Sequence, residues 1–260
     1  MAQAASAIEW YARAEGPRVV LVGKLIVSKG VDLLLSAWPL VHAANPGARL
    51  LVVGFGEYGS ALQRLWASLT AADLAEARRI AARGRALEAG EERPLRILSG
   101  FLDAPPPAYA RAASEAAGSV GFAGRLEHGE VARLVPATDA LVFPSTFPEA
   151  FGMVAAEAAA AGVLPISADH SGAAEVSRAL AVSLPRGVAE LVSFRVDEGA
   201  VLGIAHRLNA WLSMDGATRA RARGILAETA GRLWSWEGVA RDVLAASAGR
   251  LEALSPVPPE

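Results

Sequence analysis

Two lysines stand at a spacing that suits a phosphate ligand. Lys24 and Lys29 lie in GKLIVSKG, a loop that starts at Gly23 after an apolar run and precedes a helical segment. The N–H groups and the dipole of a helix N-terminus favour an anion, and two ammonium groups neutralise it. Taken alone, the loop is equally compatible with two solvated surface lysines.

Two glutamates flank the start of a helix predicted over 154–161, in the segment PEAFGMVAAEAAAAG. Glu157 stands among Ala and Val on a helix expected to be buried, where an ionised carboxylate needs a partner. Side chains lean toward the N-terminus of their helix, so Glu157 is expected to point back at a ligand, with Glu149 at the ligand's other end. Four residues offer free backbone N–H groups to a phosphate there: Phe151, Gly152, Met153 and Val154. Gly152 has no side chain and is expected to leave room for the ligand. The two glutamates and the free N–H groups together predict a ligand that carries hydroxyl groups on both sides of a diphosphate.

A third motif, GFGEYG from Gly54 to Gly59, fits the G-x-G-x-x-G pattern of dinucleotide-binding sites. Such a site also needs an Asp or Glu roughly 20 residues later, at the end of the next strand. The nearby Asp73 and Glu76 fall in an Ala-rich segment with helical character. The sequence therefore favours a tight strand-to-helix turn over an NAD site.

Short apolar runs alternate with longer helical segments along the chain. Buried strands are predicted over 18–25, 48–53, 119–122, 140–143 and 163–167. Helices are predicted over 31–44, 60–69, 130–137, 154–161 and 172–180. This repetition predicts an α/β fold with a doubly wound, Rossmann-like parallel sheet. Ligands bind outside the carboxyl ends of such strands, where the lysine loop and the glutamate segment both fall.

One domain is expected over 1–250. Its alternation is interrupted by an insertion over about 70–117, in which an Ala-rich helix and an extra strand over 95–98 are predicted. C-terminal helices are expected over 198–248. The Pro-rich tail over 251–260 is expected to be frayed.

The composition argues against several classes of protein. The 260 residues carry a net charge of -2 and no cysteine, which gives no basic footprint for nucleic acid and no cysteine-based metal site. The four histidines are scattered without metal spacing. The N-terminus lacks a signal-peptide pattern and no apolar run is long enough for a transmembrane segment. A cytoplasmic location is therefore expected.

A dispersed series of segments runs in order through the chain: GKLIVSKGVDLLLSAW, LVVGFGEYGSAL, VGFAGRLEHGEVARL, TDALVFPSTFPEAFGMVAAEAAAAG and WSWEGVARDVL. Over roughly 19–246 this series resembles the C-terminal donor-binding domain of GT-B glycosyltransferases of family 4, which are retaining nucleotide-sugar enzymes. The E-x7-E pattern from Glu149 to Glu157 is its most specific element. The resemblance implies that the glycine motif is a phosphate-free turn.

The resemblance also implies a role for each candidate residue. Lys24 and Lys29 contact the donor diphosphate, and Glu157 accepts hydrogen bonds from the ribose. Glu149 holds hydroxyls of the transferred sugar. The other substrate-binding positions are Gly23, Phe151, Gly152, Met153, Val154 and, near the base, Arg125. Because fixed cations and amides stabilise the leaving diphosphate, neither a metal nor a separate cofactor is implied; a UDP-sugar or GDP-sugar is the substrate.

By this resemblance the chain is one half of a GT-B architecture. Only a short helix expected over 6–14 precedes the first strand, so the implied partner is an N-terminal acceptor-binding domain, in the same gene or on a separate chain. The family usually carries Arg at position 24 and has a shorter insertion. Trp234 and Trp236 are expected to anchor the last helix.

Two alternatives stay open at this point. One is a stand-alone nucleotide-sugar-binding module without turnover, and the other is an NAD-dependent oxidoreductase built on the glycine motif. The sugar, the base, the acceptor and the oligomeric state are not fixed by these residues.

Overall fold

The fold is built on one parallel sheet, seen here in a computed structural model that describes residues 2–254. Most of the predicted tail, residues 255–260, lies outside the described part. The strands run in the order β3-β2-β1-β4-β5-β6, and all pairs are parallel. Their bounds are β1 Arg18–Val22, β2 Arg49–Val53, β3 Val120–Gly124, β4 Ala140–Phe143, β5 Leu164–Ala168 and β6 Ser193–Phe194. The predicted doubly wound fold is confirmed, and the strand order reverses between β1 and β4, the switch point where such folds bind ligands.

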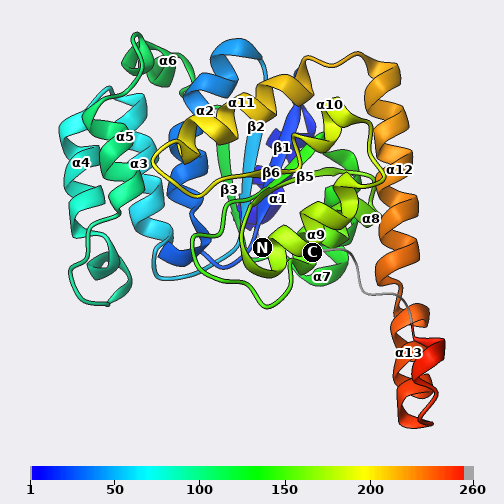
Figure 1. Ribbon diagram of the computed structural model, residues 1–260. Coiled ribbons are helices and arrows are strands. Elements are labelled where there is room, and N and C mark those ends of the chain that lie inside the picture. Colours follow the sequence, from blue (N-terminus) through cyan, green and yellow to red (C-terminus); the bar gives the residue numbers. More distant parts are fainter. Residues whose placement is uncertain (1, 255–260) are drawn as a thin grey trace.

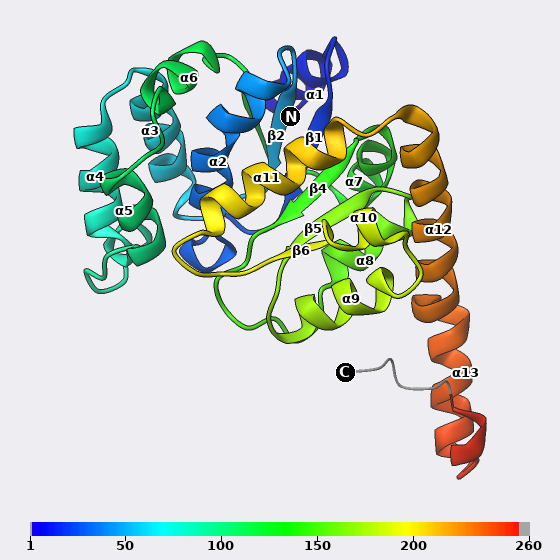
Figure 2. The ribbon, with the colours of Figure 1, turned by 45° about the horizontal axis from the view of Figure 1, so that its top comes forward.

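Both faces of the sheet are buried. Val19 and Leu21 of β1 belong to a large apolar cluster that includes α2 (Val31–Ala44) and α11 (Ala200–Leu212). Val20 joins a second cluster with α1 (Ala2–Ala12). Helices accordingly cover the sheet on both sides (Figures 1 and 2). This explains why the strands are nearly continuous apolar runs rather than alternating ones.

The helices between the strands match the predicted ones to within about two residues, apart from the extra turn described next. They are α2, α3 (Gly59–Thr70), α7 (His128–Leu134), α8 (Met153–Ala160) and α9 (Ser171–Ala181). A 3-10 turn, η3 (Val135–Ala137), completes the segment that was predicted as one helix with α7. Before residue 198 and outside the insertion, three short elements were not predicted: the 3-10 turn η1 (Val27–Lys29), α10 (Arg186–Ala189) and β6.

The insertion is helical throughout its regular elements. It contains α4 (Leu74–Arg83), the 3-10 turn η2 (Arg85–Glu88), α5 (Arg96–Asp103) and α6 (Tyr109–Glu115). The strand predicted over 95–98 is wrong. Leu98, Phe101 and Leu102 are buried together on α5, and this three- and four-residue spacing places them on one face of a helix.

The C-terminal region is helical as predicted, in three pieces. After α11 come α12 (Gly216–Trp234) and α13 (Trp236–Ser247), followed by a short turn, η4 (Leu251–Ala253). The long α12 packs on α8, whereas α13 projects beyond the body of the domain in both views (Figures 1 and 2). Trp234 packs against the core, but Trp236 is 79% exposed. The expectation that Trp236 anchors the last helix is therefore wrong, because most of its side chain is in contact with solvent rather than packed in the core.

Candidate functional site

A cavity of about 470 Å³ lies at the switch point, between the loops that follow β1 and β4. The β1 loop contributes Gly23, Lys24 and Lys29 to its lining, and the β4 loop contributes Glu149. Phe151, Met153 and Val154, at the start of α8, close another side. Seven of the ten predicted site residues are thus brought to one cavity by loops that are far apart in the sequence.

Lys29 and Glu149 are in direct contact across this cavity. Lys29 Nζ lies 2.5 Å from Glu149 Oε1, and the two side chains are only 24% and 17% exposed. The Ser145 hydroxyl donates to the same carboxylate oxygen at 2.5 Å. A half-buried ion pair is worth more than an exposed one because solvent screens it less. In this state Lys29 neutralises Glu149, while Lys24 is exposed at the cavity.

A second layer of hydrogen bonds holds the backbone of Glu149. Its N–H donates to Ser171 Oγ at 2.9 Å, and its carbonyl accepts from the N–H of Gly172 at 2.9 Å. His170 Nε2 lies 2.8 Å from the carbonyl oxygen of Ser145. Ser171 adopts a left-handed backbone, with φ of 52°, a conformation that costs energy for a residue other than glycine. The α9 N-terminus and Ser145 of the β4 loop therefore hold Glu149 in place, a role that the sequence did not reveal for Ser145 or Ser171.

Glu157 opens onto a neighbouring cavity of about 290 Å³ rather than onto the first one. Val22 and Val154 line both cavities, so they stand between the two glutamates. Trp236 and His128 also line the second cavity. The predicted arrangement of the glutamates on opposite sides of the α8 start is consistent with this placement. The expected burial of Glu157 is wrong, since the residue is exposed on the face of α8 turned away from the core.

Gly152 serves the packing of the scaffold. It is buried and lines neither cavity, and an added Cβ would lie 3.1 Å from the Cα of Ala173 on α9. An added Cβ at Gly172 would lie 2.6 Å from the Cα of Phe151. The predicted reason for Gly152, room for a ligand, is thus wrong in this state; the room is taken by α9.

The glycine motif packs backbone against backbone on the lysine loop. An added Cβ would lie 1.8 Å from the Gly23 carbonyl oxygen at Gly54 and 2.2 Å from the Leu25 carbonyl oxygen at Gly56. The Tyr58 N–H donates to that Leu25 oxygen at 3.1 Å, and the Leu25 N–H donates to the carbonyl of Phe55 at 2.8 Å. The prediction of a structural turn is supported, because these groups are used within the protein.

Arg125 stands apart from both cavities. It follows β3, is exposed, and pairs with Glu127 at 3.3 Å. Its guanidinium lies 5.5 Å from the centroid of the Phe55 ring. It occupies the same edge of the sheet as the lysine loop but lines neither cavity.

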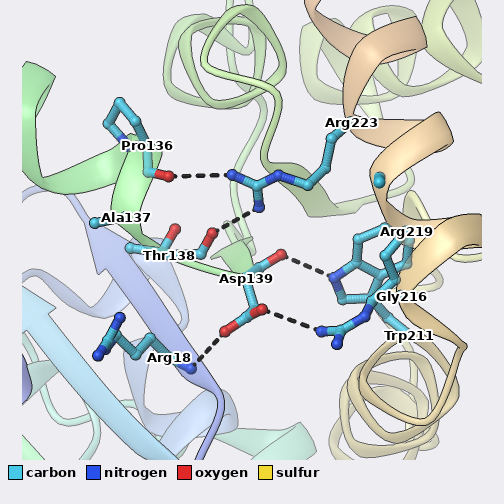
Figure 3. A pocket seen from close by; sticks show the side chains of 10 residues that line it. Arg18, Pro136, Ala137, Thr138, Asp139, Trp211, Gly216, Arg219 and Arg223 are labelled. Atoms are coloured by element: carbon cyan, nitrogen blue, oxygen red, sulfur yellow. Dashed lines mark hydrogen bonds and ion pairs between the residues drawn. The ribbon is translucent and has the colours of Figure 1, made fainter.

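A third cavity, of about 350 Å³, lies at the opposite edge of the sheet (Figure 3). Asp139, just before β4, accepts a hydrogen bond from the Arg18 N–H at 2.9 Å and pairs with Arg219 Nη1 at 3.1 Å. Arg223 donates to the carbonyls of Thr138 and Pro136 at 2.9 and 3.1 Å. These contacts fasten α12 to the sheet, so its arginines are occupied by the protein itself.

A family model described as Glycosyl transferases group 1 matches residues 109–219. The matched segment holds β3 to β6, both glutamates and Arg125. A curated relative, a GDP-mannose-dependent monoacylated alpha-(1-6)-phosphatidylinositol monomannoside mannosyltransferase of Corynebacterium glutamicum, is 28% identical over 61% of this chain and 31% of its own length. This chain therefore spans about a third of that relative.

Solved glycosyltransferase structures share the fold. Sucrose-phosphate synthase of Thermosynechococcus elongatus aligns with a TM-score of 0.55 and 22% identity, over 97% of this chain and 48% of its own. HepE of Anabaena, in complex with UDP and glucose, aligns with a TM-score of 0.61 and 17% identity over 95% and 52%. The C-terminal domain of a glycosyl transferase group 1 family protein of Francisella tularensis gives 0.54 and 16% over 88% and 92%. This chain thus has the fold of about half of the first two proteins and of nearly all of the Francisella tularensis domain.

Two further features are absent from the described residues. Across 2–254, no three or more His, Cys, Asp or Glu residues are grouped as metal ligands would be. No helix in that part of the chain has both the length and the apolar character to span a membrane.

Proposed function

We propose that this chain is the nucleotide-sugar donor-binding domain of a retaining glycosyltransferase, which transfers a sugar from an NDP-sugar to an acceptor. The observation that carries the proposal is the pair of adjoining cavities at the switch point, one with Lys24, Lys29 and Glu149 and the other with Glu157. The group 1 glycosyltransferase match supports it. The likeness to HepE, whose structures hold UDP or UDP-glucose, adds support for this class of ligand.

The donor would lie across Val22 and Val154, from one cavity to the other. Its ribose would bind Glu157, with the base toward Arg125. The diphosphate would lie between Lys24 and Lys29, near the N–H groups at the start of α8, and the sugar would contact Glu149. An exposed Glu157 suits this role, because a carboxylate that accepts ribose hydroxyls must be reachable from solvent.

Donor binding would exchange partners at Lys29. In the described structure its ammonium is paired with Glu149, whereas a diphosphate carries more charge and would compete for it. Release of Glu149 then frees a carboxylate oxygen for the sugar hydroxyls. The Ser145 hydroxyl and the Ser171–Glu149 backbone bond keep the carboxylate in place during this exchange.

The chemistry would be a transfer at the anomeric carbon of the sugar. The bond from that carbon to the diphosphate oxygen breaks and its electron pair stays on the diphosphate. The acceptor hydroxyl oxygen forms the new bond on the same face, and its proton passes to an oxygen of the departing diphosphate. Lys24, Lys29 and the α8 amides stabilise the charge on the leaving diphosphate, so the proposal needs neither a metal ion nor a separate cofactor.

The acceptor would be bound by an N-terminal domain that packs against this one. The face of α13 offers a surface for it, since Trp236, Val239, Val243 and Leu244 are between 46% and 79% exposed. The likeness to the isolated C-terminal domain from Francisella tularensis, of which this chain covers 92%, supports a donor domain that folds as a separate unit.

Calorimetric titration of the purified chain with UDP, GDP and NAD tests the proposal. Binding of one nucleoside diphosphate without NAD is the expected result, and binding of NAD alone would overturn it in favour of an oxidoreductase. Hydrolysis of a UDP-sugar or GDP-sugar by the chain would distinguish a transferase domain from the second candidate, a stand-alone nucleotide-sugar-binding module.

A further inference from the structure

The lysine loop is held in place from outside the core fold. The side chain of Glu88, in η2 of the insertion, accepts a hydrogen bond from the Val27 N–H at 2.7 Å. Val27 opens the 3-10 turn η1 (Val27–Lys29), which ends in Lys29. We propose that Glu88 is a positioning residue for donor binding: it fixes the turn that presents Lys29. This inference rests on the proposed function.

Glu88 caps the N-terminus of η1, which has no cap from its own preceding residue. The residue before the turn, Ile26, has no side-chain acceptor for the free N–H groups, and short turns leave these groups unsatisfied. A carboxylate that accepts such an N–H makes a charge-assisted bond, which is stronger than a neutral one. The Glu88 side chain is only 16% exposed, so solvent competes weakly for the bond.

The remaining contacts of the loop come from the core fold. Leu25 is held on both its N–H and its carbonyl by the glycine turn. The carbonyl of Ser28 accepts from the Thr146 N–H at 2.8 Å. Between these two anchors, Val27 is tied by Glu88. Loss of that bond releases the stretch that sets the direction of Lys29.

The support for Glu88 is itself well ordered by backbone contacts. The Arg85 N–H donates to the carbonyl of Arg93 at 3.2 Å, and the Leu95 N–H donates to that of Ala81 at 2.9 Å. At Gly84 an added Cβ would lie 1.7 Å from the Arg93 carbonyl oxygen. The backbone segments on the two sides of η2 are therefore in direct contact. The insertion therefore delivers a carboxylate to a defined place rather than on a loose loop.

The bond does not contact the donor, and its effect passes through Lys29. While Lys29 changes partner between Glu149 and the diphosphate, only its side chain needs to move if the backbone of η1 stays fixed. A fixed backbone lowers the entropy lost on binding. Glu88 therefore acts on donor affinity, and the length of the insertion gives this chain a contact that the core loops do not supply.

Calorimetry with UDP and GDP on Glu88→Ala and Glu88→Gln tests the proposal. Glu88→Ala should weaken binding of the preferred nucleoside diphosphate about tenfold, and its Val27 amide should exchange faster with deuterium. Glu88→Gln keeps an oxygen acceptor and should stay within about threefold of the wild type. Two variants serve as controls: Glu91→Ala, which removes an exposed carboxylate from the same insertion, and Arg85→Ala, which removes only the 3.7 Å partner of Glu88. Both should bind like the wild type.

A double-mutant cycle with Lys29→Ala shows whether the effect passes through that lysine. Glu88→Ala should cost much less affinity in the Lys29→Ala background than in the wild type. Equal losses in both backgrounds, or a wild-type affinity for Glu88→Ala, would overturn the inference. If the wild type itself binds no nucleoside diphosphate, it is the proposed function that fails, so the two failures are distinct.

Discussion

The two edges of the sheet hold buried or half-buried carboxylates in opposite states. At the amino edge, Asp139 is paired with Arg219 and accepts the Arg18 N–H. At the carboxyl edge, Asp32 of α2 is 4% exposed, lines a cavity of about 210 Å³ behind the lysine loop, and has no ion-pair partner among the described residues. Burial raises the pKa of the Asp32 carboxyl to about 7.

This difference distinguishes an edge whose charged groups hold α12 on the sheet from an edge whose charged groups line the proposed binding site. At the amino edge Arg219 pairs with Asp139, and Arg18 and Arg223 donate to backbone carbonyls, so all three guanidinium groups have partners within the protein. The carboxyl edge keeps Lys24 exposed, holds Lys29 in a pair with Glu149 and carries the strained Ser171. Unfavourable burial and strain at one edge are typical of a binding site, where stability is lower than packing alone would allow.

The largest expected effect comes from Asp32→Asn. A buried carboxyl with a raised pKa contributes full stability below its unfolded pKa, and that contribution is lost as the pH rises toward 7. The wild type should thus lose on the order of 4 kcal/mol of unfolding free energy, relative to Asp32→Asn, between about pH 4 and pH 7. Urea unfolding at several pH values measures this. Parallel profiles for the two proteins would mean that Asp32 is paired or hydrated.

Gly56→Ala should be nearly as damaging at the same edge. The new Cβ would collide with the Leu25 carbonyl oxygen at 2.2 Å, and overpacking against backbone costs about 3 kcal/mol. Thermal unfolding should show the loss, and nucleotide binding should weaken as the lysine loop shifts. Gly216→Ala, where the structure leaves open space, is the matched control. An unchanged melting temperature would show that the glycine turn is looser than described.

A nucleoside diphosphate should stabilise the carboxyl edge and with it the whole domain. A ligand that binds only the native state adds about 2.7 kcal/mol at a hundred times its dissociation constant. Melting curves with UDP and GDP, with inorganic phosphate as the control, measure this effect. No shift at millimolar nucleotide would count against the proposed site.

Substitutions of the two glutamates should distinguish binding of the ribose from binding of the transferred sugar. Glu157→Ala should weaken both the free nucleotide and the nucleotide-sugar by about 2 kcal/mol, because the ribose belongs to both ligands. Glu149→Ala should spare the free nucleotide and weaken only the nucleotide-sugar, with a larger effect on turnover in a complete enzyme. Titration of both variants with both ligands is the measurement. Equal losses for the bare nucleotide would contradict the placement of the donor.

The smallest effect is expected at the amino edge. Asp139→Ala should lower the unfolding free energy by about 1.5 kcal/mol, since the pair with Arg219 is about one-third exposed and therefore partly screened. Nucleotide affinity should not change, because the cavity in Figure 3 lies across the sheet from the proposed donor. A clear loss of affinity in calorimetry would erase the distinction between the two edges.

The spacing of the apolar runs along the sequence was enough to predict the order of most strands and helices. The apolar runs gave five of the six strands, and the flanking helices followed from their spacing, because a sheet buried on both faces leaves few other patterns. The failures were local. The segment 95–98 has an apolar run short enough to fit a strand or a helix, and the two-residue β6 has too little sequence to be recognised.

For the site, the sequence was enough to choose the candidate residues, whereas their hydrogen-bond and ion-pair partners depend on the tertiary structure. Lys24, Lys29 and Glu149 could be chosen because each follows a strand end, and parallel strands bring their carboxyl ends together. The Lys29–Glu149 pair, the Ser145 hydroxyl beneath it and the Glu88 cap join residues 120, 4 and 61 positions apart. Such contacts depend on side-chain direction and on how one loop lies against another, which no local pattern encodes.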